Sequence, residues 1–169
     1  FLGTIEPRKN VEAVIRAFNL LKTRQAFRDL TLVVAGRRGW RYRNVTNAAA
    51  HSPYRDNIRF LGRVENDERL FLYNAATAFA YPSFFEGFGF PPLEAQACGT
   101  PVVVADRTSL AEVVADSALK VDPWRIDDLA DALGVLLTDE SVRRTLKEKG
   151  LANVQRFSWN EAARATLRV

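Results

Sequence analysis

The sequence predicts an α/β domain in which a parallel sheet of about six strands carries helices on both faces. Short apolar runs rich in β-branched residues alternate with longer segments whose apolar residues recur at helical spacing, which is typical of parallel α/β folds. One run, Pro101–Ala105, is almost wholly apolar, as a strand covered on both faces requires. The length of 169 residues, with 47% hydrophobic and 26% charged residues, fits one globular domain.

Six segments have the composition of strands. Each combines apolar, aromatic or β-branched residues, and most of them stop at a glycine, a proline or a polar loop. In chain order, the expected strands are Phe1–Ile5, Leu30–Ala35, Ile58–Leu61, Thr77–Tyr81, Pro101–Ala105 and Leu119–Val121. Because ligands of such sheets bind beyond the carboxyl ends of the strands, the loops that follow these segments hold the candidate site.

Helical segments separate and follow the strands. The first begins after Asn10, a residue suited to the N-cap, and repeats apolar residues from Val11 to Leu21 on one face. The last begins with Ser158 and Glu161 at the spacing of a capping box. The other expected helices are the weakly patterned Arg41–Ala50, then Asn66–Ala75 with Asn66 as its cap, Pro91–Cys98, Ser109–Val114, Ile126–Leu137 and Glu140–Gly150, before the last at Trp159–Arg168.

The composition argues against several classes of protein. A single cysteine, Cys98, rules out a disulfide within the chain and fits a reducing compartment. A single histidine, His51, argues against a zinc site of Cys and His residues, and no D-x-D carboxylate pair is present. No apolar run approaches the ~18 residues of a membrane span. No signal peptide opens the chain, which starts on Phe1 inside an expected strand and therefore looks like a piece of a longer protein.

The basic residues are clustered, although the net charge is only +4. One cluster, residues 143–149, shares its helix with acidic residues and is interpreted as a solvated face. No nucleic-acid reading motif accompanies the others, so no nucleic acid is expected as a partner. Arg8-Lys9 and the arginines of residues 37–43 follow apolar runs, where a phosphate ligand could meet them.

The segment Pro82–Glu94 is the most informative loop. Gly87 and Gly89 flank Phe88 between a strand and a helix, and glycine lets a ligand approach the main chain closely. The helix N-terminus adds free amides and a partial positive charge, which together suit an anion. Because two prolines open that helix, the donors must come mainly from Gly87 to Phe90. A tight turn that needs glycine accounts for the same residues equally well.

The charged residues of these loops each have two interpretations. Arg8 and Lys9 lie near a helix N-terminus, which disfavours cations, so a bound diphosphate would resolve the conflict; otherwise they are solvated side chains. We favour the diphosphate because this loop follows a strand. Glu86 and Glu94 lie eight residues apart and either accept hydrogen bonds from sugar hydroxyls or serve as a loop acid and a helix-dipole partner.

Several motifs in register resemble the donor-site signature of family 4 glycosyltransferases, and together they span essentially the whole chain. They are Glu86-Gly87-Phe88-Gly89-Phe90-Pro91-Pro92-Leu93-Glu94-Ala95, Cys98-Gly99-Thr100-Pro101-Val102, Gly3-Thr4 with Glu6-Pro7-Arg8-Lys9-Asn10, Gly36-Arg37-Arg38-Gly39-Trp40, Phe60-Leu61-Gly62, Tyr81-Pro82-Ser83 and Phe157-Ser158-Trp159. The resemblance implies one half of a GT-B fold, a Rossmann-like domain. Residues 1–169 would form the nucleotide-sugar (donor) binding domain, with the N-terminal acceptor domain absent.

The resemblance also implies roles for individual residues. Glu86, Arg8 and Lys9 would be catalytic: Glu86 would contact the donor sugar, and the two cations would neutralise the departing diphosphate, where charge develops. Many members have an arginine in place of Thr4, and Arg8 would reach the same phosphate from the other end of the loop. No metal ion and no cofactor is expected. The donor-binding residues implied are Gly3, Thr4, Gly36, Val64, Gly87, Phe88, Gly89, Phe90 and Glu94, with Glu94 on the ribose hydroxyls.

The activity implied is that of a retaining glycosyltransferase of polysaccharide biosynthesis. It would move a hexose from a nucleotide-sugar to a glycan or a lipid-linked acceptor, and the variant Glu6–Asn10 points weakly to mannose and GDP-mannose. This half is expected to be inactive alone. The alternatives are a stand-alone nucleotide or nucleotide-sugar binding module and a sugar-nucleotide epimerase of the same fold. A cytoplasmic location is expected, with any contact with the cytoplasmic membrane face made through the missing half.

Overall fold

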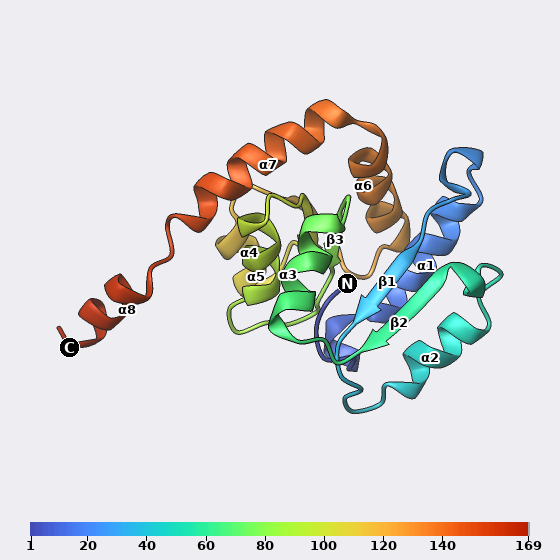
Figure 1. Cartoon of the computed structure of the whole chain (residues 1–169), viewed down its shortest axis with the longest axis horizontal. Coiled ribbons are helices and arrows are strands. Elements are labelled where there is room, and N and C mark those ends of the chain that lie inside the picture. The colour runs from blue at the N-terminus through green and yellow to red at the C-terminus, as the bar shows by residue number, and fades with distance from the viewer. Residues whose placement is uncertain (169) are drawn as a thin grey trace.

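Parallel strands form the frame of the molecule, as the sequence predicts (Figure 1). The computed structural model describes residues 1–168, and within them the strands divide into two sheets. One sheet pairs β1 with β2, and the other has the order β3-β4-β5, with every pairing parallel. The strands are β1 (Leu32–Ala35), β2 (Ile58–Gly62), β3 (Phe79–Tyr81), β4 (Val102–Ala105) and β5 (Leu119–Val121).

The segment Phe1–Ile5 differs from the prediction, because it makes two isolated parallel bridges instead of a continuous strand. Gly3 has a φ of +151°, which takes the main chain out of regular strand geometry between the two bridges. The described residues therefore contain five strands where about six were predicted. The segment still lies between the two sheets, since its main chain bonds to the β1 side and the Phe1 ring stacks on Tyr81 of β3 at 5.6 Å.

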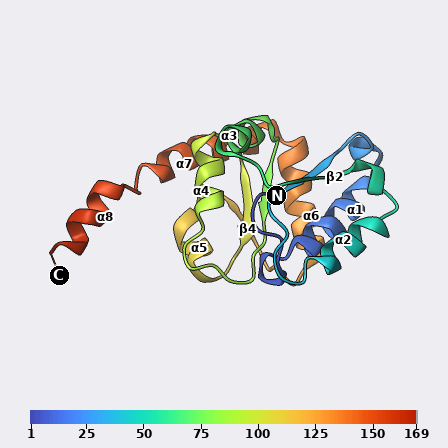
Figure 2. The same ribbon diagram turned by 60° about the horizontal axis from the view of Figure 1, so that its bottom comes forward.

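Helices lie on both sides of the strands. Figure 2 shows α4 and α5 on one side of β4 and α1, α2 and α6 on the other. Within residues 1–168, no helix combines the length and the apolar character needed to cross a membrane. The helices are α1 (Val11–Lys22), α2 (Arg43–Ala50), α3 (Asn66–Ala75), α4 (Phe90–Ala97), α5 (Thr108–Val114), α6 (Ile126–Thr138), α7 (Glu140–Val154) and α8 (Trp159–Thr166), with single 3₁₀ turns at Pro7–Lys9, Gln25–Phe27 and Arg55–Asn57.

Two helix starts differ from the sequence-based assignment. The N-cap of α3 is Glu65 rather than Asn66, and Glu65 and Glu68 form a capping box in which each side chain accepts from the other residue's amide. At α8 the Ser158 hydroxyl accepts from the amide of Glu161, as predicted. The Glu161 carboxylate, however, pairs with Arg164 one turn along the helix, so only half of that predicted box forms.

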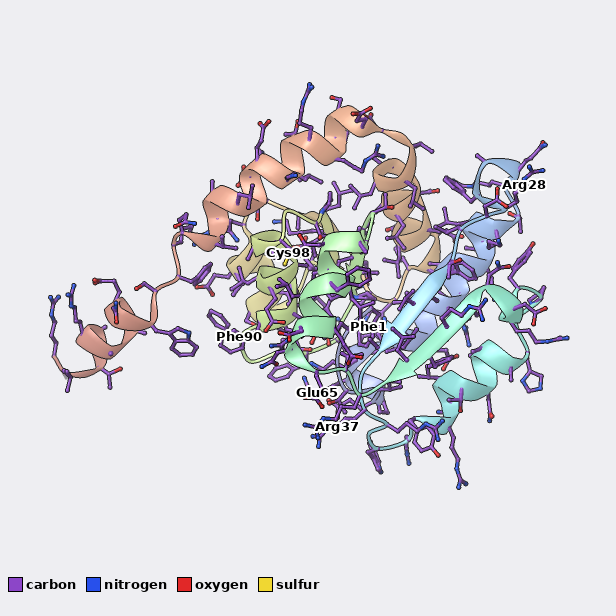
Figure 3. All side chains as sticks on the ribbon, in the orientation of Figure 1. Phe1, Arg28, Arg37, Glu65, Phe90 and Cys98 are labelled. Carbon is purple, nitrogen blue, oxygen red and sulfur yellow. The ribbon has the colours of Figure 1, made fainter. Side chains whose placement is uncertain are left out.

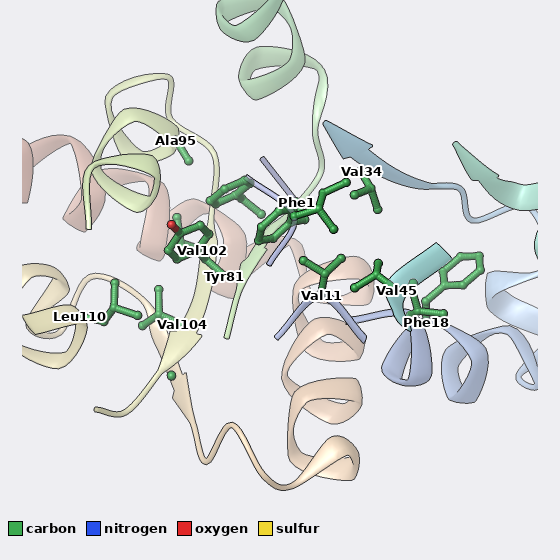
Figure 4. Close-up of a cluster of buried hydrophobic side chains, with 14 of the residues drawn as sticks. Phe1, Val11, Phe18, Val34, Val45, Tyr81, Ala95, Val102, Val104 and Leu110 are labelled. Carbon is green, nitrogen blue, oxygen red and sulfur yellow. The ribbon is translucent and has the colours of Figure 1, made fainter. Parts of the chain in front are cut away.

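The apolar core occupies both faces of β4. Val102 and Val104 belong to one cluster of buried side chains, whereas Val103 between them belongs to a second cluster. This alternation explains why the strand is apolar throughout its length. Figure 4 shows part of the first cluster, in which Phe1 lies between Tyr81 and Val34.

Asn10 joins three loops at the carboxyl ends of the strands. It has a left-handed conformation with a φ of +55°, which asparagine tolerates better than most residues. Its side chain does not cap α1; instead, its Nδ2 atom donates to the carbonyls of Pro82, at 3.2 Å, and Pro123, at 2.8 Å. Both contacts are buried, so the loops after Phe1–Ile5, β3 and β5 are held together where a ligand of this fold binds.

Candidate functional site

The centre of the candidate site is the carboxylate of Glu86, which meets both cations of the first loop. Arg8 Nη1 lies 2.9 Å from Glu86 Oε2, and Lys9 Nζ lies 2.5 Å from Glu86 Oε1. The cations belong to the 3₁₀ turn Pro7–Lys9, which directly precedes α1, so they lie near the helix N-terminus as predicted. The structure thus brings together all three residues expected to be catalytic, although Glu86 lies 78 residues along the chain from Arg8 and 77 from Lys9.

The environment of Glu86 keeps it charged. Its side chain is 8% exposed, which excludes the interpretation as an exposed loop acid. Burial alone would raise the pKa of Glu86, but the hydrogen bonds and positive charges of Lys9 and Arg8, together with the Ser83 hydroxyl at 2.6 Å, outweigh it and lower the pKa. The ionised carboxylate in turn balances Lys9, which is 7% exposed and also donates to the Tyr81 hydroxyl at 2.5 Å.

These contacts revise the interpretation of Arg8 and Lys9. The predicted conflict with a helix N-terminus is resolved inside the protein, because Glu86 provides the counter-charge. Arg8 has a second carboxylate partner, with its Nε atom 2.6 Å from Glu6 Oε1, and its side chain is 47% exposed. Arg8 is therefore the member of the cluster that can turn toward a ligand, whereas Lys9 is fixed.

The glycine loop after Glu86 keeps main-chain donors available. Gly89 is the N-cap of α4 with a φ of +113°, a conformation that favours glycine, and a Cβ atom there would lie 2.7 Å from Leu110 Cδ2 and force that side chain to move. Gly87 has open space around it. Among the described residues, no acceptor bonds the amides of residues 87–90. Free amides at the start of a helix suit an anion, as predicted.

The carbonyl and amide of Glu86 are held from α5. Ser109 Oγ donates to the Glu86 carbonyl at 2.8 Å, and the Glu86 amide donates to Thr108 Oγ1 at 3.4 Å. Sequence reasoning did not assign these two hydroxyls to the site, nor Ser83 and Tyr81 to its centre. The sequence signal that could have found them is weak, since a hydroxyl residue after a strand is common in any loop.

Glu94 lies apart from the Glu86 cluster. Its Oε2 atom accepts from the Tyr73 hydroxyl at 2.9 Å, and its Oε1 atom lies 3.4 Å from Arg69 Nη1. Burial and then the Glu94 charge raise the pKa of Tyr73, so that hydroxyl remains a donor. Glu94 is the fifth residue of α4 rather than a first-turn residue, so the helix-dipole interpretation is wrong. The α3 partners hold its carboxylate one-third exposed, where ligand hydroxyls can reach it.

Gly3 and Gly36 pack against each other under the loops. A Cβ atom on Gly36, whose φ is +138°, would lie 1.9 Å from the Gly3 carbonyl oxygen, so no other residue fits. Thr4 stands beside a cation of the next loop, since Arg37 Nε donates to Thr4 Oγ1 at 3.3 Å. Arg37, and not only Arg8, is therefore placed to supply the guanidinium that the resemblance associates with the position of Thr4.

Three predicted site residues lie at the edges of this arrangement. Val64 is half-buried in the loop between β2 and α3. Phe88 packs edge-on against Phe157 at 5.6 Å, and Phe90 stacks on Trp159 at 5.9 Å, so both rings contact the segment that leads into α8. Figure 3 shows Phe90 on the side of the domain that faces α8.

Four arginines between the end of β1 and the first residue of α2 carry uncompensated charge. Within residues 1–168, none of them forms an ion pair with a carboxylate; they are Arg37, Arg38, Arg41 and Arg43. Two of them rest on aromatic rings, Arg41 on Trp40 at 4.5 Å and Arg38 on Tyr42 at 5.3 Å. Figure 3 shows Arg37 at the same end of the strands as Glu65, the end at which the other candidate loops gather.

The described part of the chain holds no candidate side chains for binding a metal ion or for catalysis by a thiol. No three or more His, Cys, Asp and Glu side chains there are placed to hold a metal ion. Burial raises the pKa of Cys98, the opposite of an activated nucleophile, and its side chain packs against the first core cluster.

A comparison with protein families gives one match over most of the chain. The sequence model described as "Glycosyl transferases group 1" matches residues 1–152. Among curated proteins, the O-antigen chain mannosyltransferase B of Escherichia coli is 39% identical over 167 residues, which cover 99% of this chain and 44% of that protein. A D-inositol 3-phosphate glycosyltransferase of Kribbella flavida is 35% identical over 175 residues, covering 99% of this chain and 41% of that protein.

Solved structures show the same fold. Sucrose-phosphate synthase from Thermosynechococcus elongatus aligns with a TM-score of 0.85 at 27% sequence identity, covering 99% of this chain and 43% of that chain. The chain thus spans less than half the length of these relatives.

Proposed function

The chain belongs to the group 1 family of glycosyl transferases, and on that basis we propose that it forms the donor-binding half of a retaining glycosyltransferase. The enzyme would move a hexose from a nucleotide-sugar to a glycan or a lipid-linked acceptor, and a second half would supply the acceptor site. The relative named as an O-antigen chain mannosyltransferase supports mannose as the hexose and GDP-mannose as the donor.

One observation carries this proposal: Glu86 lies between Arg8 and Lys9, directly before the free amides of residues 87–90. Such a group offers both kinds of contact that a nucleotide-sugar needs. Amides and cations suit a diphosphate, and a carboxylate suits the hydroxyls of a sugar. All of these groups come together at the carboxyl ends of parallel strands, where the ligands of this architecture bind.

In this proposal the cations stabilise the leaving diphosphate and Glu86 orients the sugar. As the bond between the anomeric carbon and the diphosphate breaks, negative charge grows on the leaving oxygens, and Arg8, Lys9 and the helix N-terminus stabilise it. Because Arg8 binds Glu86 before a donor arrives, phosphate would compete with Glu86 for the guanidinium. That exchange would free one oxygen of the carboxylate to orient the sugar. Retention at the anomeric carbon belongs to the proposal through the family resemblance, and the anomer of the product tests it.

Two other functions remain as alternatives to a transferase half. A stand-alone nucleotide-binding module would bind the donor without transferring its sugar. A sugar-nucleotide epimerase would use the same fold on the same ligand. The pairing of Glu86 with two cations, together with relatives named as transferases, favours the transferase.

Thermal unfolding of the chain with GDP, UDP, ADP and GDP-mannose tests the donor site. A ligand at about 100 times its dissociation constant stabilises the folded state by about 2.7 kcal/mol, which a melting curve resolves. We expect one base to raise the melting temperature. Glu94→Gln should lose that shift, because a neutral amide accepts the ribose hydroxyls less strongly. A matched control is Glu112→Gln, which changes an exposed glutamate of α5.

The outcomes separate the alternatives. No shift with any nucleotide, in a chain that melts cooperatively, contradicts a donor site in this half. A shift that survives Glu94→Gln as fully as Glu112→Gln supports a nucleotide site elsewhere in the fold. Transfer of mannose from GDP-mannose by the gene product that contains the chain distinguishes a transferase from a binding module, and an epimerised nucleotide-sugar would identify the third alternative.

A further inference from the structure

A groove of about 330 Å³ lies beside the Glu86 cluster, on the side of α1 and α6. Three parts of its walls directly follow strand-like segments: Glu6 follows Phe1–Ile5, Phe84 follows β3, and Trp124 follows β5. Asn44 adds a wall from the first turn of α2. The groove therefore opens at the carboxyl ends of the strands, like the donor site. Its volume lies within the range of ligand sites and suits a group about the size of one sugar ring.

One wall of the groove is an aromatic platform. Trp124 stacks on Phe84 with ring centroids 4.2 Å apart and planes 28° from parallel, yet the tryptophan is 66% exposed. The platform is held in place, since the amide of Phe84 donates to the Arg8 carbonyl at 2.8 Å and the amide of Trp124 to Asp122 Oδ1 at 3.0 Å. Asn10 also bonds the residue that precedes Trp124, so the surface is preorganised for a flat ligand.

The other walls carry groups that accept or donate hydrogen bonds. Glu6 and Glu12 present carboxylates, Asn44 presents an amide, and Arg16 and Arg41 present guanidinium groups. Glu12 pairs with Arg16 and Glu6 pairs with Arg8 beside the groove, so Arg41 is the cation of the lining that has no carboxylate partner among the described residues. Because carboxylates and an amide share the lining with the guanidinium groups, a polar ligand that both donates and accepts hydrogen bonds fits the groove better than an anion does.

A neutral pyranose has the matching chemistry. One face of its ring presents polarised C–H bonds, which the negative face of an aromatic ring attracts, and its edge carries hydroxyls that bond to carboxylates and amides. We propose that the groove between Trp124 and Glu6 binds a neutral hexopyranose unit of the acceptor glycan. The inference rests on the proposed function, in that the bound glycan would be the acceptor of the transferred sugar.

A short chain of contacts places the groove next to the donor cluster. Glu6 on the groove wall contacts Arg8 at 2.6 Å, and Arg8 contacts Glu86 at 2.9 Å. A glycan in the groove therefore lies alongside the group expected to hold the donor sugar. The half of the protein described here would contribute to acceptor binding as well as to donor binding.

Saturation-transfer NMR of the chain with α-linked mannobiose and with maltose tests the groove. We expect transfer to the ring C–H protons of at least one disaccharide. Trp124→Ala should weaken that binding about tenfold, which corresponds to about 1.4 kcal/mol. Asn44→Ala, which touches neither Arg8 nor Glu86 in the described structure, should also weaken it. The matched control is Trp159→Ala, since Trp159 is also an exposed tryptophan but lies on α8.

The same variants distinguish this inference from the proposed function. Trp124→Ala and Asn44→Ala should keep the melting shift caused by a nucleotide. If no disaccharide binds the wild-type chain, or if Trp159→Ala weakens binding as much as Trp124→Ala, the inference is overturned while the donor site stands. If a disaccharide binds at the groove but no nucleotide shifts the melting curve, the groove is supported as a glycan site and the proposed donor half is contradicted.

Discussion

At the scale of single residues, the ion pair of Lys9 and Glu86 needs a physical explanation, because two charged groups are buried together. Neither side chain is more than 8% exposed, and each charge would be costly to bury without the other. Sequence spacing could not find this pair, because it joins two loops that approach only when the strands pair. The resemblance to a family put both residues on one ligand but did not place them in contact with each other.

We predict that Glu86→Gln lowers the free energy of unfolding at pH 7 by about 3 kcal/mol, because it leaves Lys9 buried without a counter-charge. The folded-state pKa of Glu86 lies below its unfolded value, so its contribution is present above the unfolded pKa and is lost as the pH falls through the folded pKa. Urea unfolding between about pH 7 and pH 3 should show the wild-type and variant curves converging at acid pH.

Asp116→Asn is the control for this pH profile. Lys149 lowers the pKa of Asp116 too, but this carboxylate is fully solvated, so its replacement should change the unfolding free energy little at any pH. Parallel pH profiles for the wild-type chain and Glu86→Gln would show that the pair with Lys9 does not contribute as described.

We predict that Gly36→Ala destabilises the fold by about 4 kcal/mol or more, because the new methyl group would meet the Gly3 carbonyl oxygen at 1.9 Å and the φ of +138° is strained for alanine. Gly87→Ala, with open space at its Cβ position, should stay within about 1 kcal/mol of the wild type. The midpoints of urea denaturation compare them, and equal losses would contradict the close contact between Gly36 and Gly3.

At the scale of elements, the helix and strand pattern was predictable wherever periodicity was strong. The apolar face of α1 and the apolar run of β4 appear as predicted, because burial on one or two faces leaves its period in the sequence. The failures lie where tertiary contacts override local preference. Phe1–Ile5 is interrupted as a strand at Gly3. The Asn10 side chain donates hydrogen bonds to two distant carbonyls instead of capping its own helix.

A buried amide network joins α4, α5 and α7. Asn153 of α7 donates to Gln96 Oε1 at 2.9 Å and to the Val113 carbonyl at 3.0 Å, and Gln96 Nε2 donates to Ser117 Oγ at 2.7 Å. We predict that Asn153→Ala lowers the unfolding free energy by about 2–3 kcal/mol, because it leaves the buried Gln96 Oε1 atom and the Val113 carbonyl without this donor. Asn74→Ala, on the exposed face of α3, should cost less than about 1 kcal/mol. Similar losses in urea denaturation would contradict the network.

At the scale of the whole molecule, the body of the domain and its last helix differ in how they are held. The body is packed around β4, whereas Figure 1 shows α8 extending away from it, and none of residues 159–166 is buried. Contacts between α8 and the body include the stacking of Trp159 on Phe90. The sequence predicted the helix from its caps but had no means to show that its apolar side lacks a neighbour here.

We predict that deletion of residues 159–169 changes the free energy of unfolding by no more than about 1 kcal/mol, because it removes little buried surface. Leu136→Ala in α6, a fully buried position, should cost about 2–5 kcal/mol. Urea denaturation of both variants provides the comparison. A large loss on deletion would show that α8 stabilises the body through more than its aromatic stacking.

The unpaired arginines of residues 37–43 should affect the association rate of an anion more than its residence time. Glu6 and Glu86 balance Arg8 and Lys9, so the centre of the candidate site attracts a distant anion weakly. The neighbouring arginines have no such compensation and can guide an anion, such as the diphosphate of the proposed donor, toward the strands from beyond contact range. The association rate should therefore fall steeply as salt is added, while the residence time, which depends on groups in contact, should change much less.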